Sequence, residues 1–276
     1  MKNLKLYIDT KLRANRCSDN TIKAYESNIR EMLSFIDKDE KEITYLDLLQ
    51  WKTKISSQSS ATINRKIVAI KGYFEFLKDI DYIKDSPAKK IDNVKIENKI
   101  KVPLTVDEIN AMLKATSNKR DKAIIDLLVS TGLRISELTN LTLDNIHSNS
   151  IIINGKGNKE RVIFINEKTK KSIEDYLQDR GNADLQNVFL STQKTKLNPN
   201  SFDRTLKKIG KKAKIKDYER ISCHLFRATS ASLMSQNGVP IQVIKEVLGH
   251  SNIQTTMIYV KNTEQQIKDA MNIQLF

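Results

Sequence analysis

Several side chains in the second half of the chain have the types and spacings that phosphate chemistry needs. An arginine follows Thr131-Gly132-Leu133, where the glycine ends one apolar helix and another helix begins at once. An arginine at such a junction can present its planar fork beside a helix N-terminus, which itself favours anions. A lysine stands on a predicted hairpin tip, and two of the three histidines lie in the last fifth of the chain near an arginine and a tyrosine. The six residues are Arg134, Lys156, His224, Arg227, His250 and Tyr259.

Each of these side chains also has an ordinary interpretation. A single histidine is more often a surface or core side chain than a catalytic group, and we keep that interpretation for His147, in the loop before the first predicted strand. The combination of cations, imidazoles and a tyrosine, rather than any one member, indicates a reaction centre.

The residues for other kinds of phosphate chemistry are missing from the sequence. Zinc would need three or four ligands, and Cys223 beside His224 offers only one adjacent pair. Acidic residues are scattered among lysines, which disfavours a two-metal centre, and no G-x-x-x-x-G-K-[ST] loop occurs. We therefore expect no metal and no cofactor, so that any reaction at a phosphate relies on cationic side chains.

The balance of charges predicts a polyanionic partner. The 276 residues carry 47 Lys+Arg against 33 Asp+Glu, a formal net charge of +14, and the sequence pI is near 9.5. The excess is +5 up to residue 96 and +9 beyond it, so both halves of the chain contribute. Nucleic acid or an anionic membrane surface would satisfy this charge.

Neither a membrane span nor secretion is expected. The apolar runs are shorter than the roughly 18 to 20 residues that a spanning helix needs. The first residues lack the apolar core of a signal peptide. Cys17 and Cys223 are far apart and neither belongs to a C-x-x-C pair, which favours a reducing, cytoplasmic location.

Apolar periodicity divides the chain into a helical first part and a mixed second part. Steps of three and four residues predict helices at about 22–36 and 63–77, and weaker patterns predict two more at about 4–13 and 44–55. We interpret Trp51 as a core anchor rather than as a base-stacking residue. The predicted organisation is a helical bundle over residues 1–84, a linker over 85–103 and a second domain over 104–276.

The second domain is predicted to be mainly helical with one small hairpin. Thr105 and Glu108 have the spacing of a capping box that opens a helix through Ala115. Two β-branched runs, 150–154 and 161–165, flank a glycine-containing turn and predict an antiparallel pair. Further elements are a short strand at 188–190 and helices at about 120–130, 135–141, 168–178, 201–212, 225–237, 241–248, 255–259 and 263–271.

Five sequence motifs, in this order, resemble the signature boxes of one family. They are TGLRISEL (131–138), GKGNKER (155–161), His224-x-x-Arg227, LGHSNIQTT (248–256) and Tyr259. The pattern is similar to the tyrosine recombinases of the phage-integrase type, most of all to Xer-like and transposon-borne members. Thr62-Ile63-Asn64-Arg65-Lys66 and the apolar stretch at 73–77 also resemble that family's N-terminal domain. The resemblance implies a helical, SAM-like core-binding domain followed by an α+β catalytic domain.

The resemblance also implies a reaction: a site-specific DNA recombinase that cleaves and rejoins strands through a 3′-phosphotyrosyl intermediate and a Holliday junction. Tyr259 would be the nucleophile that attacks a scissile phosphodiester and releases a 5′-hydroxyl. Arg134 and Arg227 would bind the non-bridging oxygens, where negative charge grows in the transition state. Lys156 would protonate the leaving 5′-oxygen.

The remaining family positions have supporting roles. His224 would act as an acid or base near the phosphate, and His250 would hydrogen-bond a non-bridging oxygen. Glu137 matches an acidic position that orients the site. The box around Arg227 departs from the common pattern, because Phe226 precedes the arginine and Ala228 follows it. Neither change removes a catalytic group, so activity is still expected.

Basic residues on two predicted helices are expected to contact the backbone of double-stranded DNA. Eight positive charges fall within 17 residues between positions 204 and 220. A solvated charged face remains an equal interpretation for any one of these residues. The predicted DNA-contacting residues are Arg65, Lys66, Lys71, Arg204, Lys207, Lys208, Lys211 and Lys212.

The 17 residues after Tyr259 have an apolar side that could either pack on their own domain or dock on a neighbouring protomer. The resemblance favours docking in trans, which would build a homotetramer on DNA, with accessory proteins as further partners. Two alternatives stay open: a catalytically inactive DNA-binding protein of the same fold, and a type IB topoisomerase-like enzyme that relaxes supercoils as a monomer.

Overall fold

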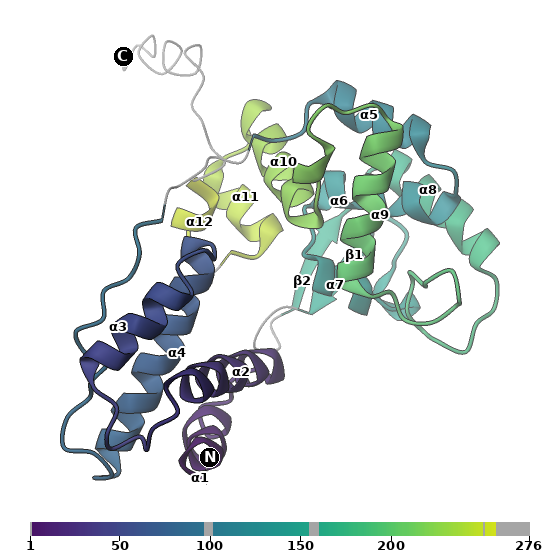
Figure 1. Ribbon diagram of the computed structural model, residues 1–276. Coiled ribbons are helices and arrows are strands. Elements are labelled where there is room, and N and C mark those ends of the chain that lie inside the picture. Colours follow the sequence, from purple (N-terminus) through teal and green to yellow (C-terminus); the bar gives the residue numbers. More distant parts are fainter. Residues whose placement is uncertain (1, 97–101, 155–159, 251, 258–276) are drawn as a thin grey trace, which may run out of the picture. The chain divides into compact units, whose positions relative to one another are not determined.

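The computed structural model describes residues 2–96, 102–154, 160–250 and 252–257 (Figure 1). The chain divides into two compact units, Met1–Lys99 and Ile100–Phe276. Helices dominate both units, and the described residues contain one two-stranded sheet. The predicted class, mainly helical with a small hairpin, is therefore confirmed.

The N-terminal unit contains the four predicted helical segments. Helix α1 (Lys2–Tyr7) continues into a π-helical segment (Ile8–Arg13), and α2 (Asp19–Ile36), α3 (Tyr45–Lys54) and α4 (Ser60–Asp79) follow. Polar side chains start the last three helices: Ser18, Thr44 and Ser59 each accept a hydrogen bond from a backbone N–H of the first turn. Helix α2 packs against both α3 and α4.

The core of this unit is rich in aromatic side chains and takes in one residue that was predicted to contact DNA, Lys66. Trp51 is fully buried in the same core as Tyr73 and Phe74, which confirms its interpretation as a core residue. The Lys66 side chain is only 7% exposed, and its ammonium lies 2.6 and 2.7 Å from the two carboxylate oxygens of Glu31. Lys66 was predicted to contact DNA. In this structure its charge is paired with Glu31, so a contact with DNA would require this ion pair to open.

The first part of the predicted linker packs on the N-terminal unit. Ala88 and Ile91 are fully buried in the core of the N-terminal unit. The side-chain amide of Asn64 donates to the carbonyl of Val94 at 2.8 Å and accepts from the Val94 N–H at 2.7 Å. The stretch up to residue 94 thus belongs to the N-terminal unit, although its lack of periodicity is typical of a linker.

The C-terminal unit is built around helix α6. It begins with α5 (Val106–Ala115), where the predicted capping box of Thr105 and Glu108 is present, followed by α6 (Lys119–Thr131) and α7 (Ile135–Asn140). Helix α6 packs against α8 and α10. The later helices are α8 (Glu167–Arg180), α9 (Pro199–Lys212), α10 (Cys223–Gln236), α11 (Ile241–Leu248) and α12 (Gln254–Met257).

The predicted hairpin is present and the predicted third strand is not. Strands β1 (Ser150–Asn154) and β2 (Glu160–Phe164) pair antiparallel, with Ser150 opposite Phe164 and Asn154 opposite Glu160. Residues 188–190 form no strand, because the antiparallel pairing around them stops at two isolated bridges, Thr142 with Asn187 and Leu190 with Lys196. The helix predicted at 263–271 lies outside the described residues.

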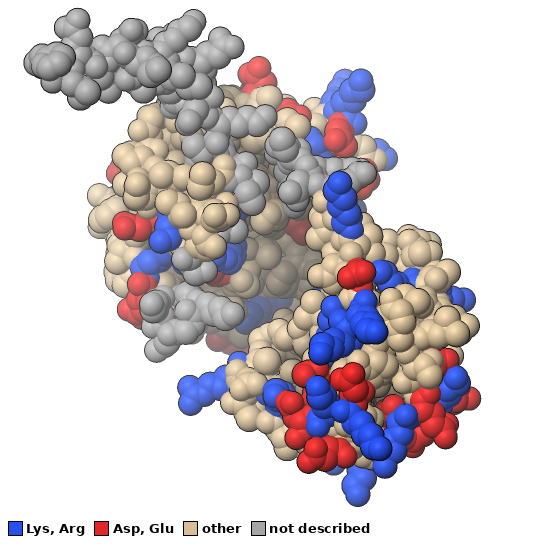
Figure 2. Space-filling model, turned by 90° about the vertical axis from the view of Figure 1, so that its left-hand side faces the viewer, with Lys and Arg blue, Asp and Glu red and all other residues tan. Residues whose placement is uncertain are grey.

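The surface of the described residues carries charges of both signs on the face that Figure 2 shows. On the face shown in Figure 2, basic and acidic side chains are interspersed, so the excess positive charge does not form one continuous sheet there. Among the described helices, none is long and apolar enough to cross a membrane.

Candidate active site

The junction of α6 and α7 places Arg134. Helix α6 ends at Gly132, whose φ of +62° is a left-handed conformation that suits glycine. A Cβ atom at this position would also lie 2.5 Å from Cδ2 of Leu248 and 3.2 Å from Ser230. The glycine therefore lets the end of α6 approach α10 and α11 closely, and Arg134 follows as the N-cap of α7.

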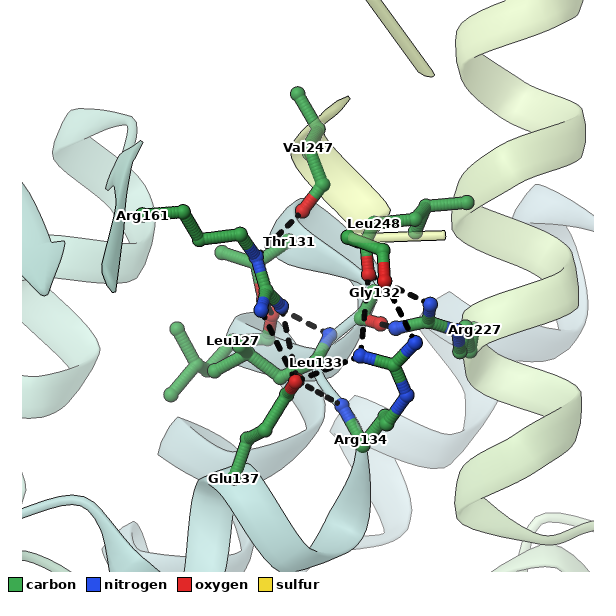
Figure 3. A network of polar contacts seen from close by, with 11 residues as sticks. Leu127, Thr131, Gly132, Leu133, Arg134, Glu137, Arg161, Arg227, Val247 and Leu248 are labelled. Carbon is green, nitrogen blue, oxygen red and sulfur yellow. Dashed lines mark hydrogen bonds and ion pairs between the residues drawn. The ribbon is translucent and has the colours of Figure 1, made fainter. Parts of the chain in front are cut away.

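Glu137 is the buried acceptor at the centre of the site (Figure 3). Its side chain is 6% exposed, and one oxygen accepts from the Arg134 backbone N–H at 2.8 Å while the other accepts from Arg134 Nη1 at 2.8 Å. Arg161 adds a bidentate pair, Nη1 to Oε1 at 3.0 Å and Nη2 to Oε2 at 2.9 Å. Burial alone would raise the pKa of Glu137, but the hydrogen bonds from Arg161 and Arg134 outweigh it and lower the pKa below its ordinary value.

Three arginines converge on the end of helix α11. Arg161 Nε donates to the carbonyl of Val247 at 3.2 Å, Arg227 Nη2 to that of Leu248 at 2.6 Å, and Arg134 Nη2 to that of Gly249 at 2.8 Å. The last carbonyls of a helix have no partner within it and form the negative end of its dipole. The C-terminal end of α11 therefore holds all three guanidinium groups in fixed positions.

Arg134 and Arg227 share an acceptor. Arg134 Nη1 also reaches the Leu248 carbonyl, at 3.5 Å, and Arg227 Nη1 donates to the Gly132 carbonyl at 2.8 Å. Arg227 is 3% exposed, whereas the Arg134 side chain is 40% exposed. Figure 3 shows the two guanidinium groups pointing toward the same carbonyl region. Two guanidinium groups that reach one oxygen can also bind the oxygens of one phosphate.

His250 lies next to this arginine pair. It follows Gly249, the left-handed cap of α11, and its Nδ1 is 2.8 Å from the hydroxyl oxygen of the buried Thr256. Burial, then the charges of Arg227 and Arg134, lower the pKa of His250 from 6.5 to about 4. The ring is therefore neutral at pH 7. When Nδ1 accepts from Thr256, the ring proton is on Nε2, which can then donate to an oxyanion.

A cleft gives solvent access to these residues. It has a volume of about 1170 Å³ and lies among the hairpin, α7 and α11. Arg134, Glu137, Arg161 and His250 are among its lining residues. A bound anion in this cleft could reach the exposed part of Arg134 without displacing the buried core.

Family models and related proteins match this chain over both units. The model of the phage integrase family matches residues 103–266, and that of the phage integrase N-terminal SAM-like domain matches residues 4–80. Tyrosine recombinase XerA of Pyrococcus horikoshii is 35% identical over 262 residues, covering 92% of this chain and 87% of its own length. A tyrosine recombinase of Pseudothermotoga lettingae is 30% identical over 280 residues, covering 98% and 96%. The chain belongs to the phage integrase family.

It is a tyrosine recombinase, an enzyme of DNA strand cleavage and rejoining. The fold agrees with a solved structure of this kind. The crystal structure of a lambda integrase (75–356) dimer bound to a COC′ core site has a TM-score of 0.80, covers 96% of each chain and is 16% identical in sequence. The family models and the two related recombinases confirm the resemblance seen in the sequence motifs.

The structure of this tyrosine recombinase brings four of the predicted site residues together: Arg134, Glu137, Arg227 and His250. His224 lies in the first turn of α10, on the helix that carries Arg227, and its charge contributes to the lowered pKa of His250. Lys156 and Tyr259, predicted to be the general acid and the nucleophile, lie outside the described residues.

Sequence reasoning missed Arg161. In the sequence this arginine ends the motif GKGNKER and opens the predicted strand at 161–165, with no role assigned to it, although it contacts Glu137 and the end of α11. Its position at the start of a strand, beside the predicted hairpin turn, was the available signal. No spacing rule links residue 161 with residues 137 and 247, so its partners emerge only from the fold.

The predicted basic face of this recombinase is partly engaged by its own residues. Lys207 lies 3.1 Å from a Glu219 oxygen, and Lys211 lies over the ring of Tyr218 at 5.9 Å. Arg204, Lys208 and Lys212 on α9 are exposed, as is Arg65 on α4, and Lys71 is half-buried. The exposed members can approach a DNA backbone without breaking a contact that the structure shows.

Proposed function

We propose that Tyr259 of this recombinase attacks a scissile DNA phosphodiester at a specific site. Its oxygen forms a bond to phosphorus, the bond to the 5′-oxygen breaks, and the strand is held as a 3′-phosphotyrosine. The tyrosine proton leaves and a proton is delivered to the 5′-oxygen. A second strand's 5′-hydroxyl reverses the step, and two such exchanges pass through a Holliday junction. The observation that carries this proposal is the convergence of Arg134 and Arg227 on one carbonyl oxygen beside a neutral His250.

The two arginines are proposed to stabilise the transition state. Negative charge builds on the non-bridging oxygens as the phosphorus becomes pentacoordinate. Arg227 is buried and its guanidinium group is held by two carbonyls, so it needs little reorganisation to stabilise this transition state. Loss of such a preorganised donor costs roughly 10²- to 10³-fold in rate. Arg134→Ala and Arg227→Ala are expected to lose cleavage on this scale.

Two other side chains are proposed to transfer protons, and a third to donate a hydrogen bond. Lys156 is proposed to protonate the 5′-oxygen, and His224, exposed in the first turn of α10, to act as an acid or base near the phosphate. The neutral His250 is proposed to donate a hydrogen bond from Nε2 to a non-bridging oxygen. A protonated ring could also donate, but a neutral ring whose Nδ1 accepts from Thr256 already supplies the donor at pH 7.

Double-stranded DNA is the proposed partner of both units. The helical N-terminal unit is proposed to be the core-binding half, contacting DNA through Arg65 and Lys71. The catalytic unit is proposed to contact it through the basic residues of α9. The net charge of +14 supports this assignment. Phosphate contacts by six to ten cations would make the affinity fall roughly 10³- to 10⁵-fold between 50 and 200 mM salt.

The oligomeric assembly and the cellular location are proposed by analogy with the family. The residues after Tyr259 are proposed to dock on a neighbouring protomer, which would give a homotetramer across two DNA duplexes, with accessory proteins as further partners. The apolar side of this segment in the sequence supports the proposal. The proposed location is the cytoplasm, where the DNA substrate and reduced cysteines occur together.

The test is covalent capture of a nicked DNA substrate. The full-length protein is incubated with a nicked duplex that carries its cognate site, in the presence of a chelator, and an SDS-resistant protein–DNA adduct is measured. Wild type should form the adduct and Tyr259→Phe should not. A wild-type protein that forms no adduct, or a Tyr259→Phe variant that forms one, would exclude the mechanism. Relaxation of a plasmid that lacks the site would instead support a topoisomerase.

A further inference from the structure

Arg161 uses all three of its guanidinium nitrogens to hold two other elements. Nη1 and Nη2 bind the two oxygens of Glu137 at 3.0 and 2.9 Å, and Nε donates to the Val247 carbonyl at 3.2 Å (Figure 3). The side chain is 16% exposed. Arg161 therefore connects β2 with α7 and α11 through contacts that no single point charge could reproduce.

The backbone around Arg161 leaves room for this arrangement. A Cβ atom at Gly249 would lie 2.9 Å from Nη1 of Arg161 and 3.0 Å from its Cζ. The guanidinium group thus packs against the backbone of Gly249, the residue whose carbonyl accepts from Arg134. Arg161 and Arg134 therefore contact the same short segment at the end of α11, and both bind the carboxylate of Glu137.

The sharing of Glu137 determines what Arg134 can do. Both Glu137 oxygens are engaged by the Arg161 fork. Arg134 gives the carboxylate its backbone N–H and, from its guanidinium group, only Nη1. A buried carboxylate that lost Arg161 would be undercompensated, because charges are poorly solvated there. The nearest remaining cation is Arg134, which could then turn its whole fork onto Glu137 and away from the cleft.

We propose that Arg161 is a positioning residue for phosphate binding: by saturating Glu137 and bracing the end of α11, it keeps Arg134 directed at the scissile phosphate. The inference rests on the proposed function, since it concerns the same arginine and the same phosphate. It adds a third arginine to the site, one that acts through Glu137 and need not touch DNA.

The first measurement is the single-turnover cleavage rate of Arg161→Ala on the nicked cognate duplex. Misplacement of a catalytic group by about 1 Å can cost roughly 10²-fold, and we expect a loss of that size with DNA affinity unchanged. Arg161→Lys should retain the fold and fall between wild type and Arg161→Ala. Arg13→Ala, which removes an exposed arginine paired with Asp9, is the matched control and should cleave like wild type.

The second measurement separates positioning from general destabilisation. Adding Glu137→Gln to Arg161→Ala removes the charge that draws Arg134 away, so the double variant should cleave faster than Arg161→Ala alone. A methylphosphonate at the scissile position lacks one charged oxygen and should narrow the gap between wild type and Arg161→Ala. If Arg161→Ala merely damaged the fold, the double variant would be as slow as Arg161→Ala. The loss of rate would then be equal on the phosphodiester and on the methylphosphonate.

Three outcomes would overturn the inference. They are wild-type cleavage by Arg161→Ala, no recovery in the double variant, and a defect that disappears with a 5′-thiol leaving group but persists with the methylphosphonate. The last result would assign Arg161 to protonation of the leaving group. If wild type itself forms no adduct, the proposed function fails. If wild type forms one and Arg161→Ala equals it, only the role of Arg161 fails.

Discussion

The hydroxyl oxygen of Thr256 lies 2.8 Å from Nδ1 of His250, and Thr256 is fully buried. This contact determines which ring nitrogen can face a phosphate. A histidine whose Nδ1 accepts a hydrogen bond carries its proton on Nε2. Thr256 therefore belongs to the site, although in the sequence it reads only as the last letter of LGHSNIQTT.

Thr256→Val should slow DNA cleavage without weakening DNA binding. Valine has nearly the same shape as threonine but cannot fix the ring, so His250 would donate to the phosphate for a smaller fraction of time. A loss of roughly 5- to 10-fold corresponds to one net hydrogen bond of about 1 kcal/mol. Single-turnover cleavage measures the effect. Thr256→Ser keeps the hydroxyl and should stay close to wild type. Equal rates for the valine and serine variants would contradict this role.

The lowered pKa of His250 predicts how stability changes with pH. Above pH 6.5 the ring is neutral in both folded and unfolded chains and contributes nothing. Between pH 6.5 and about 4 the unfolded chain binds a proton at this ring and the folded chain does not, so stability falls as the pH falls. Urea unfolding at pH 6.5 and 4.5 should show a larger loss for wild type than for His250→Gln, which does not titrate. An equal loss in both proteins would show that the ring titrates normally in the fold.

The sequence predicted the elements well because their signals are local. The capping box at Thr105, the glycine stop at Gly132 and the β-branched runs of the hairpin each involve residues a few positions apart. The catalytic boxes could be recognised for the same reason. Burial, however, depends on partners far along the chain. Lys66 reads as one more cation on a helix, and only the approach of Glu31, 35 residues away, buries it.

The site was predicted as a set of residues but not as a structure. Arg134, Arg227 and His250 were identified by type and motif, yet the element that holds them was not. The carbonyls at the end of α11 have no signature in the sequence, because every residue carries a carbonyl. For the same reason Arg161 had no assigned partner, and its contacts with Glu137 and Val247 follow from the packing of β2 against α7 and α11.

Gly132→Ala should destabilise the fold more than Gly238→Ala does. Both glycines have positive φ, +62° and +76°, so alanine pays backbone strain of about 1 to 2 kcal/mol at either position. A Cβ at Gly132 would in addition lie 2.5 Å from Leu248, whereas nothing lies within 4 Å of one at Gly238. Overpacking of this kind adds roughly 1 to 3 kcal/mol.

Urea unfolding of the two variants gives the comparison, and the cleavage rate gives a second one. Arg134 and Arg227 both donate to the Leu248 carbonyl. A shift of Leu248 should therefore also lower the cleavage rate of Gly132→Ala. Similar losses of unfolding free energy in the two alanine variants would mean that the close approach of α6 and α11 does not add to the cost of Gly132→Ala.

The neighbouring pair Arg65 and Lys66 offers a direct test of which N-terminal cations contact DNA. Arg65 is exposed on α4, and Lys66 is buried against Glu31. If Arg65 binds a phosphate, Arg65→Ala should reduce the slope of log affinity against log salt by about 0.9. Lys66→Ala should leave that slope unchanged and lower the free energy of unfolding by about 1 to 2 kcal/mol, since the half-exposed Glu31 can regain water. DNA binding at several salt concentrations and urea unfolding supply the two readouts. A reduced salt slope in Lys66→Ala would show that the ion pair opens when DNA binds, because an ammonium that stays on Glu31 releases no counterions.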